Sequence, residues 1–348
     1  MHSHTIDAAQ QGFFKACKTT RALRKAGLTE SKFPWRNKKY RTTIWKNTSI
    51  RFKNNKLELS MGVHNPKVLI TLPVEMFNVV RFLEVRLVFD KKSRHYTWHI
   101  VAENGKQAKP ALGINIVSVD LGEIHPAVVG DHQESTIITC RERRHEVQGH
   151  AKRLASIAKS LSKKKKMSRR YRKLVRTKSK MKAKHECVTR DMEHKISRAI
   201  VNVAIECQSS TIVIGDIRDI ADGVALGKQT NQKISSWNHG QVQKYVKYKA
   251  ESEGITVKLV NERYSSQTCL SCGNRHKPKG RNYDCPACGF RCHRDVVGQI
   301  NILSIFRYGE PGKIPAPQRV KHRMPHNLRL MRRCPDTGQI FLQNKSVA

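Results

Sequence analysis

Alternating apolar and polar positions dominate the first third of the chain. Between Arg41 and Ala102, five short runs alternate in this way and are separated by turn-forming Asn, Lys and Gly. A period of two is typical of strands that bury one face. We therefore predict a small antiparallel β-barrel or curved sheet over residues 41–108, preceded by a short helix from Asp7 to Lys25.

The apolar pattern changes after residue 109. INIVSVDLG and TIVIGDI are short and largely apolar, as expected of strands buried on both faces. In chain order we predict a three-stranded meander, basic helices, a strand, a Gly-rich loop over 221–237, a helix, a strand and a last helix. This succession is that of an RNase H-like fold with an insert before its last helix. The fold class is therefore a multidomain α+β and α/β protein.

Charge narrows the choice of partners. Among 348 residues, Lys plus Arg is 67 and Asp plus Glu is 27, so the formal net charge is +40. Such an excess repels itself unless a polyanion neutralises it. No apolar run reaches the roughly 18 residues of a membrane span, and no secretion signal is visible. We expect a cytoplasmic protein, nucleoid-associated when bound to DNA, with nucleic acid and no membrane as partner. A ribosomal-type protein that only neutralises phosphate is the alternative.

Positive charge is concentrated in one segment. Residues 147–185 contain no Asp or Glu, and 13 of the 22 residues from Lys163 to Lys184 are Lys or Arg. A thin apolar stripe at helical spacing predicts two long helices that form a hairpin. A charge run can be a merely solvated face, but we predict that this one lies along a phosphate backbone. The residues predicted to contact phosphate are Lys163, Lys164, Lys165, Lys166, Arg169, Arg170, Arg172 and Lys173.

Two C-x2-C pairs predict a zinc ribbon. Cys269 and Cys272 form the first pair, and Cys285 and Cys288 form the second after twelve intervening residues. Two such pairs supply the four thiolates of a tetrahedral Zn²⁺ site. Four Cys leave no open position, so we predict a structural rather than a catalytic metal. The absence of a signal peptide favours reduced thiols over disulfides.

Two acidic residues are candidate ligands of a second kind of metal. Asp120 closes an apolar strand, and Asp295 stands at the start of the last helix. Alone, each has an ordinary explanation, a turn residue for the first and a helix N-cap for the second. In an RNase H-like fold the first strand and last helix meet. Together the two carboxylates can then hold Mg²⁺ or Mn²⁺ for phosphodiester cleavage.

These motifs, in this order, resemble the TnpB family, the transposon-encoded relatives of type V CRISPR effectors. SVDLG is similar to the first RuvC motif, TIVIGDI occupies the second position, and RDVVGQINIL is similar to the third. NERYSSQTCLSCGNRHKPKGRNYDCPACGF is similar to the ribbon of that family, and the Lys-rich hairpin stands at its expected place. The match extends from about Trp45 to Phe306.

The resemblance implies a domain plan. Residues 1–40 would be a short remnant of a helical recognition region, 41–108 a wedge-like barrel, and 109–264 with 293–308 a RuvC-like nuclease. Residues 265–292 would be the zinc ribbon insert and 309–348 a basic flexible tail. The implied function is an RNA-guided DNA endonuclease that binds a guide RNA from the transposon end and cuts double-stranded target DNA. We expect a monomer or homodimer.

Three departures from the family pattern bear on activity. Where the family places Glu in its second motif, this chain has Gly215 followed by Asp216. Glu142 follows the third predicted strand, at the expected start of the next helix, where RNase H enzymes carry an active-site Glu. We therefore predict a rearranged site of Asp120, Glu142 and Asp295, with Asp216 assisting. For Glu142, an acid favoured by the helix dipole is an equal alternative. The Asn expected after Asp295 is Val297, and the N-terminal region is short. A nuclease-inactive RNA-guided repressor or a decayed transposon copy is the alternative function.

Overall fold

The chain divides into two compact units, Met1–Lys106 and Gln107–Ala348, which are described separately. The structure is a computed structural model. It describes residues 3–35, 40–74, 78–90, 94–110, 113–217, 227, 231–232, 237–325, 330–333 and 340–343. The Gly-rich loop predicted over 221–237 therefore lies almost wholly outside the described residues.

The first unit combines one helix with two antiparallel sheets. Trp45, Leu57, Leu59, Leu72 and Val85 form its buried core, and the Trp45 indole N–H donates to the Ser60 carbonyl at 3.0 Å. The strand orders are β1-β5-β6 and β2-β3-β4. Four of the five predicted runs form one strand each, whereas the first is interrupted at Asn47–Ser49 and gives β1 and β2, which lie in different sheets. Closure into a barrel stays a prediction. The elements are α1 (Ser3–Lys25), β1 (Thr43–Lys46), β2 (Ile50–Lys53), β3 (Lys56–Leu59), β4 (Val68–Thr71), β5 (Arg81–Asp90) and β6 (His95–Glu103).

The second unit is built on a six-stranded sheet with the order β11-β10-β7-β8-β9-β14. β7 (Asn115–Asp120), β8 (Ala127–Gly130) and β9 (Glu134–Ile138) form an antiparallel meander. β10 (Ser209–Asp216) pairs in parallel with β7, and β11 (Thr256–Asn261) pairs in parallel with β10. The succession of strands and helices predicted for an RNase H-like fold is therefore present.

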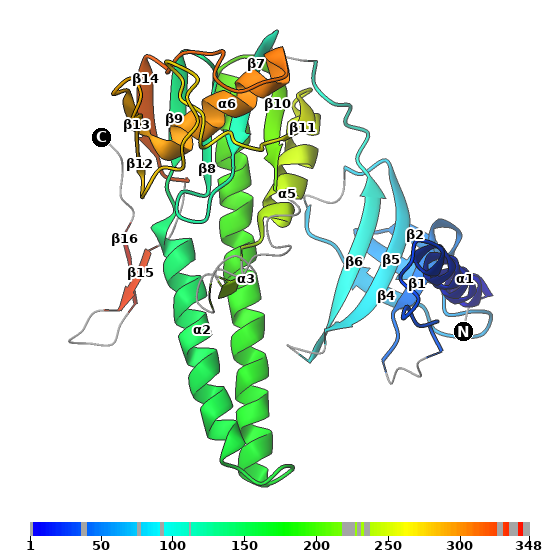
Figure 1. The fold of residues 1–348 in the computed structure, drawn as a ribbon. Helices are drawn as coiled ribbons and strands as arrows, with labels where there is room; N and C mark the ends of the chain where they lie inside the picture. Colours follow the sequence, from blue (N-terminus) through cyan, green and yellow to red (C-terminus); the bar gives the residue numbers. More distant parts are fainter. Residues whose placement is uncertain are drawn as a thin grey trace. The chain divides into compact units, whose positions relative to one another are not determined.

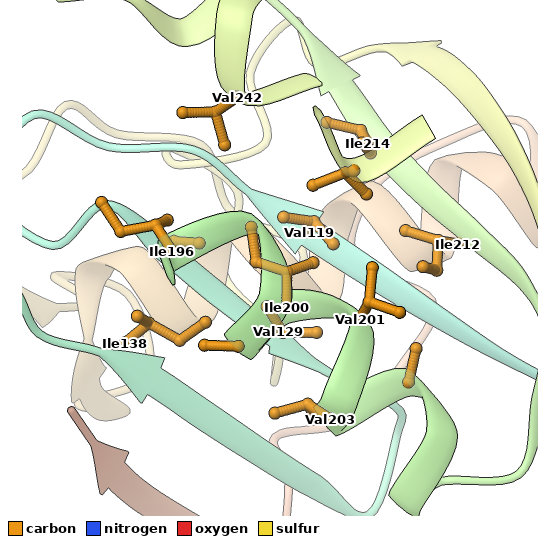
Figure 2. Packing of buried hydrophobic residues seen from close by; sticks show 14 of the residues in the cluster. Val119, Val129, Ile138, Ile196, Ile200, Val201, Val203, Ile212, Ile214 and Val242 are labelled. Atoms are coloured by element: carbon orange, nitrogen blue, oxygen red, sulfur yellow. The ribbon is translucent and has the colours of Figure 1, made fainter. Parts of the chain in front are cut away.

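Helices cover both faces of this sheet (Figure 1). On one face lie α3 (Arg169–Glu206) and α5 (His239–Ser252), and on the other lies α6 (Arg294–Tyr308). Alternation along the strands divides the core, since Val129 and Ile138 pack towards α3 whereas Val128 and Ile137 pack towards α6. Figure 2 shows the α3 side, where Ile196, Ile200, Val201 and Val203 meet residues of β7 to β10.

Buried hydrogen bonds tie α6 to the sheet. The Gln299 amide donates to the Ser118 hydroxyl at 2.7 Å and to the Gly130 carbonyl at 2.9 Å, and its oxygen accepts from Ser135 at 2.5 Å. The Asn301 amide donates to the Ser265 and Thr268 carbonyls, just before the first cysteine of the ribbon. Because buried polar groups are costly unless paired, these bonds fix how α6 crosses the sheet.

The basic segment forms the predicted hairpin of two long helices. α2 (Arg141–Ser162) leads through a short turn into α3, and both project from the sheet (Figure 1). One boundary differs from expectation, because a single helix of 38 residues replaces the second basic helix and the separate helix predicted near 191–209. Its basic half is exposed, and its apolar half packs in the core. Within the described residues, no helix is long and apolar enough to cross a membrane.

The C-terminal segment is more ordered than its composition predicts. We expected a flexible tail over 309–348, but β14 (Arg319–Arg323) pairs in parallel with β9 and completes the sheet. The Arg323 guanidinium also forms two hydrogen bonds with Glu206 at 2.7 and 2.8 Å. β15 (Leu330–Arg333) and β16 (Ile340–Gln343) pair as a hairpin. Backbone pairing with an edge strand requires no apolar pattern, so the residues give little sign of it.

Candidate metal centres

Three acidic residues lie where neighbouring parallel strands end. Asp120 is the last residue of β7, Asp216 is the last residue of β10, and Glu262 follows β11 directly. Asp216 is paired in register with Asn261, the residue before Glu262. Since parallel strands end at one edge of a sheet, all three acids stand at the carboxyl edge of the β7-β10-β11 half.

The last helix passes directly over this edge. Asp295 lies in the first turn of α6, and Gly298 follows it on the same face one turn later. A Cβ atom added at Gly298 would stand 2.5 Å from Oδ2 of Asp120, so only glycine allows the helix to approach so closely. Asp120 and the start of α6, predicted to meet, are therefore in contact.

The negative charges of Glu262 and Asp295 both act on the Asp120 carboxyl group. The pKa of Asp120 is raised well above its usual value by burial, then by the negative charge of Glu262 and that of Asp295. Burial raises the pKa of Glu262 to about 7, and the charge of Asp216 adds to this shift. Carboxylates that repel one another in a partly buried site are stabilised by a multivalent cation.

Glu262 was missed by the sequence analysis. A Cβ atom at Gly215 would collide with Oε2 of Glu262, so the Glu262 side chain fills the space beside the very position at which the family pattern has its Glu. Oε2 of Glu262 is buried and has no hydrogen-bond partner in the part of the chain that the structure describes. The one signal in the sequence was an acid directly after a short strand. This signal was not sufficient, because only the pairing of β11 with β10 brings Glu262 beside Gly215.

Asp295 has additional neighbours from the ribbon and from the loop after β7. Nη1 of Arg281 donates to both carboxylate oxygens of Asp295 at 3.0 Å. Ligand atoms of Asp295, His125 and His293 lie within 4.8 Å of one another. The Asp295 amide also donates to Nδ1 of His293 at 3.3 Å, which caps α6. This end of the site is thus the more crowded one.

The donor set suits hard cations. Asp120, Glu262 and Asp295 offer carboxylate oxygens, which Mg²⁺ and Mn²⁺ prefer. The buried Oε2 atom of Glu262, which no described residue pairs, is what is expected where a cation would supply the partner. The residues present therefore fit a divalent metal, and two ions about 3.5–4 Å apart would need acids spread over several elements, as these are.

Glu142 is in the first turn of α2, as predicted. Its Oε2 atom is buried and has no hydrogen-bond partner among the described residues. However, the charges that act most on Asp120 are those of Glu262, Asp295, Arg294 and Arg281, and Glu142 is not one of them. A catalytic role for Glu142 stays a prediction.

The four ribbon cysteines converge on one point. Their sulfur atoms all lie within 4.8 Å of one another, with Cys269 and Cys288 3.7 Å apart and Cys272 and Cys285 3.6 Å apart. Tetrahedral Zn²⁺ with bonds of about 2.3 Å requires sulfur separations of about 3.8 Å, so the site fits zinc. The ribbon hairpin, β12 (Asn282–Asp284) and β13 (Arg291–His293), follows the first knuckle and carries the second in its turn.

The ribbon is packed against the last helix. Cys269, Leu270, Tyr283 and Cys285 share a buried cluster with residues of α6. The Tyr283 hydroxyl donates to the Gln267 carbonyl at 3.0 Å, which joins the hairpin to the segment after Glu262. Zinc bound by the four cysteines would therefore support the segment that carries both Glu262 and Arg281.

All eight basic residues singled out in the sequence are exposed. They surround the turn between α2 and α3 and the first turns of α3, where Ser168 caps the helix by accepting from the Tyr171 amide at 3.2 Å. The exposed residues are Lys163, Lys164, Lys165, Lys166, Arg169, Arg170, Arg172 and Lys173. Their charges are therefore accessible to a polyanion.

Comparison with known proteins gives a consistent set of relatives. Residues 239–302 match the family described as Cas12f1-like, TNB domain. The chain is similar to a TnpB-like protein of Methanocaldococcus jannaschii, with 28% identity over 157 residues, 44% of this chain and 55% of that protein. It is also 33% identical over 112 residues to the CRISPR-associated endodeoxyribonuclease Cas12f1 of Sulfoacidibacillus thermotolerans, covering 31% of this chain and 25% of that protein.

The fold has a solved counterpart. Cas12f1 in its complex with sgRNA and target DNA superposes with a TM-score of 0.54 at 13% identity, over 82% of this chain and 68% of that one. The likeness shows a shared mixed α/β fold. The matched regions span only about half, or less, of the two curated relatives, 55% and 25%.

Proposed function

Because the chain belongs to the TnpB family, we propose that it is an RNA-guided DNA endonuclease that cleaves target DNA by metal-dependent phosphodiester hydrolysis. Relatives with this fold are a named endodeoxyribonuclease and a protein solved with guide RNA and target DNA. The proposed partners are a guide RNA from the transposon end and double-stranded DNA.

One observation carries the proposal. Three acids from separate elements, Asp120, Glu262 and Asp295, converge at the carboxyl edge of the sheet, and Glu262 fills the space beside Gly215. A structural role would not require mutually repelling carboxylates in a partly buried site. The acid that the second motif lacks is thus supplied by the next strand in the sheet.

Each group has a proposed task. Asp120, Glu262 and Asp295 would hold Mg²⁺ or Mn²⁺, which supply an activated water and neutralise charge on the scissile phosphate. Asp216 adds negative charge beside Glu262. Asp295 would exchange its hydrogen bonds with Nη1 of Arg281 for the metal ion, and the released guanidinium would then pair with a DNA phosphate. The exposed hairpin would bind the guide RNA or its duplex with target DNA.

The alternative is an RNA-guided DNA-binding protein without nuclease activity, because Gly215 removes the acid of the second motif. The position of Glu262 favours the enzyme. The test is cleavage of a plasmid that carries a guide-matched target in the presence of Mg²⁺. We expect wild type to cut, and Asp120→Ala and Glu262→Gln each to reduce the rate at least about 100-fold, because loss of a ligand should cost at least as much as loss of a group that only orients one, about 10–100-fold.

Two matched variants make this test specific. Glu142→Gln should cut at a rate near that of wild type, whereas Asp216→Asn should be only moderately slower. If Glu142→Gln is inactive and Glu262→Gln is active, the site is the one predicted from sequence instead. Guide-dependent binding by a wild-type protein that never cuts would establish the repressor.

A further inference from the structure

A second cluster of metal-ligating side chains lies on the basic hairpin, outside the carboxyl-edge site and the ribbon. Glu146 and His150 are four residues apart on α2, so both face the same side of that helix. His185 faces them from α3. One carboxylate oxygen and one nitrogen from each ring lie within 4.8 Å of one another.

The two histidines differ in their contacts, because Nδ1 of His185 pairs with Glu146 whereas Nδ1 of His150 has no partner among the described residues. Their rings are stacked, with centroids 3.8 Å apart and an interplanar angle of 1°. His150 is only 7% exposed, yet its Nδ1 atom is buried and no described residue forms a hydrogen bond with it. Burying a ring nitrogen without a hydrogen-bond partner raises the free energy of the folded state. The position of Nδ1 in His150 therefore indicates a ligand that would bind this atom.

We propose that Glu146, His150 and His185 form a transition-metal site, occupied by Zn²⁺, that fastens α2 to α3. Two imidazoles and one carboxylate are a frequent zinc ligand set, which leaves one position for water. The mixture of nitrogen and oxygen donors favours Zn²⁺ over Mg²⁺, which prefers oxygen ligands alone.

The distances allow this with small side-chain rotations. Tetrahedral Zn²⁺ with bonds of about 2.0–2.1 Å places its ligand atoms about 3.3 Å apart. Nδ1 of His185 is already 3.1 Å from Oε1 of Glu146. The remaining separations, at most 4.8 Å, would close if the His150 and His185 rings turned out of their stack.

Positively charged side chains near the three ligands lower the expected affinity of the site for a metal ion but do not change its ligands. Nη2 of Arg153 lies 3.1 Å from Oε1 of Glu146, and Lys182 adds positive charge near His150. These cations compete with a metal for the carboxylate. The Arg153 side chain is 52% exposed and can withdraw into solvent, so we expect a site weaker than the four-thiolate ribbon.

The test is zinc stoichiometry of the full-length protein, dialysed against buffered Zn²⁺ with excess Mg²⁺ to occupy the carboxyl-edge acids. His150→Gln should hold about one zinc ion fewer per chain than wild type, whatever the content of the ribbon and of the carboxyl-edge site. The matched control is His145→Gln, because His145 is an exposed residue of the same helix. It should retain the wild-type stoichiometry.

Co²⁺ substitution distinguishes the two sites by their ligands. The ribbon should give intense near-ultraviolet thiolate absorption, whereas the hairpin site should add only weaker visible bands typical of nitrogen and oxygen ligands. The visible absorption that the hairpin site adds should be lost in His185→Gln and Glu146→Gln, with the absorption of the ribbon site unchanged. Retention of the thiolate bands also shows that each variant is folded.

Equal zinc content in wild type, His150→Gln and His145→Gln would overturn the proposal. So would a loss of one zinc ion in His145→Gln alone, because this would reveal adventitious binding at the surface. The site is independent of nuclease activity, and its test requires neither guide nor target.

Discussion

Glu262 shows how a single side chain would link the proposed metal centre to pH. Its pKa in the folded protein is about 7, raised from 4.5 by burial and by Asp216. The metal-free folded state therefore holds a proton that the unfolded state releases between about pH 4.5 and 7. This group accordingly makes the fold less stable as pH rises through that window, because burial of the charged form is unfavourable.

We therefore predict that, without Mg²⁺, the urea midpoint of wild type falls from pH 4.5 to pH 7 more steeply than that of Glu262→Gln. Added Mg²⁺ should reverse the difference above pH 7, where the carboxylate is charged. Glu251→Gln, an exposed substitution on α5, is the control and should follow wild type. Parallel curves for wild type and Glu262→Gln would contradict the buried carboxylate.

The role of a residue could be predicted from sequence where the spacing between neighbouring residues is enough to identify a site. The four zinc ligands follow from two local pairs, so no tertiary knowledge was needed. Asp120 and Asp295 required the order of elements, which the apolar runs supplied. Glu262 required knowledge that β11 lies beside β10, and this pairing leaves no mark in the residues themselves.

Among the elements, α6 illustrates how closely packing controls the site. It is buried on nearly every side, and Gly298 allows it to cross within van der Waals contact of Asp120. We predict that Gly298→Ala slows cleavage at least about 10-fold by displacing the Asp120 carboxylate, because a misplacement of about 1 Å can cost 10²-fold. The measurement is the single-turnover cleavage rate.

A glycine in α5, on the opposite face of the sheet, provides the comparison. A Cβ atom at Gly240 in α5 would meet nothing within 4 Å. Gly240→Ala should therefore cut like wild type and should stabilise its helix slightly, by up to about 1 kcal/mol. If both substitutions slow cleavage alike, the close approach of α6 to Asp120 is not what matters.

Element boundaries were less predictable than element types. The second helix of the hairpin and the following core helix are one continuous α3, because no Gly or Pro interrupts residues 169–206. A change from basic to apolar composition suggested two helices, yet composition changes which surface a helix contacts without ending it. β14 was missed for the opposite reason, since its basic residues give no strand signal and only pairing with β9 orders it.

At the scale of the whole molecule, charge is distributed very unequally. The exposed tip of the hairpin carries Lys163 to Lys166 and the basic residues that follow, whereas Asp120, Asp216, Glu262 and Asp295 lie at the carboxyl edge of the sheet. We predict that replacing Lys163, Lys164, Lys165 and Lys166 with Ala weakens guide RNA binding and lowers its salt dependence. The slope of log K against log salt should shrink by about 0.7–0.9 for each phosphate that the variant no longer neutralises.

The matched control keeps the charge and changes only the side chain. Replacing the same four Lys with Arg should preserve the slope, because counterion release depends on charge. Filter binding at several salt concentrations measures both variants. An unchanged slope in the Ala variant would mean that the hairpin tip does not bind phosphate.

The collision between Gly215 and Glu262 has a consequence for how such a chain can change over generations. The space between the ends of β10 and β11 holds one acidic side chain, so an acid from one strand leaves no room for a side chain from the other. Introducing Glu at position 215 alone would bring two acids into the same space, and losing Glu262 alone would leave that space without an acid. Changing from an acid at position 262 to an acid at position 215 therefore requires two substitutions, and either one alone is unfavourable. A lineage with one arrangement consequently tends to retain it.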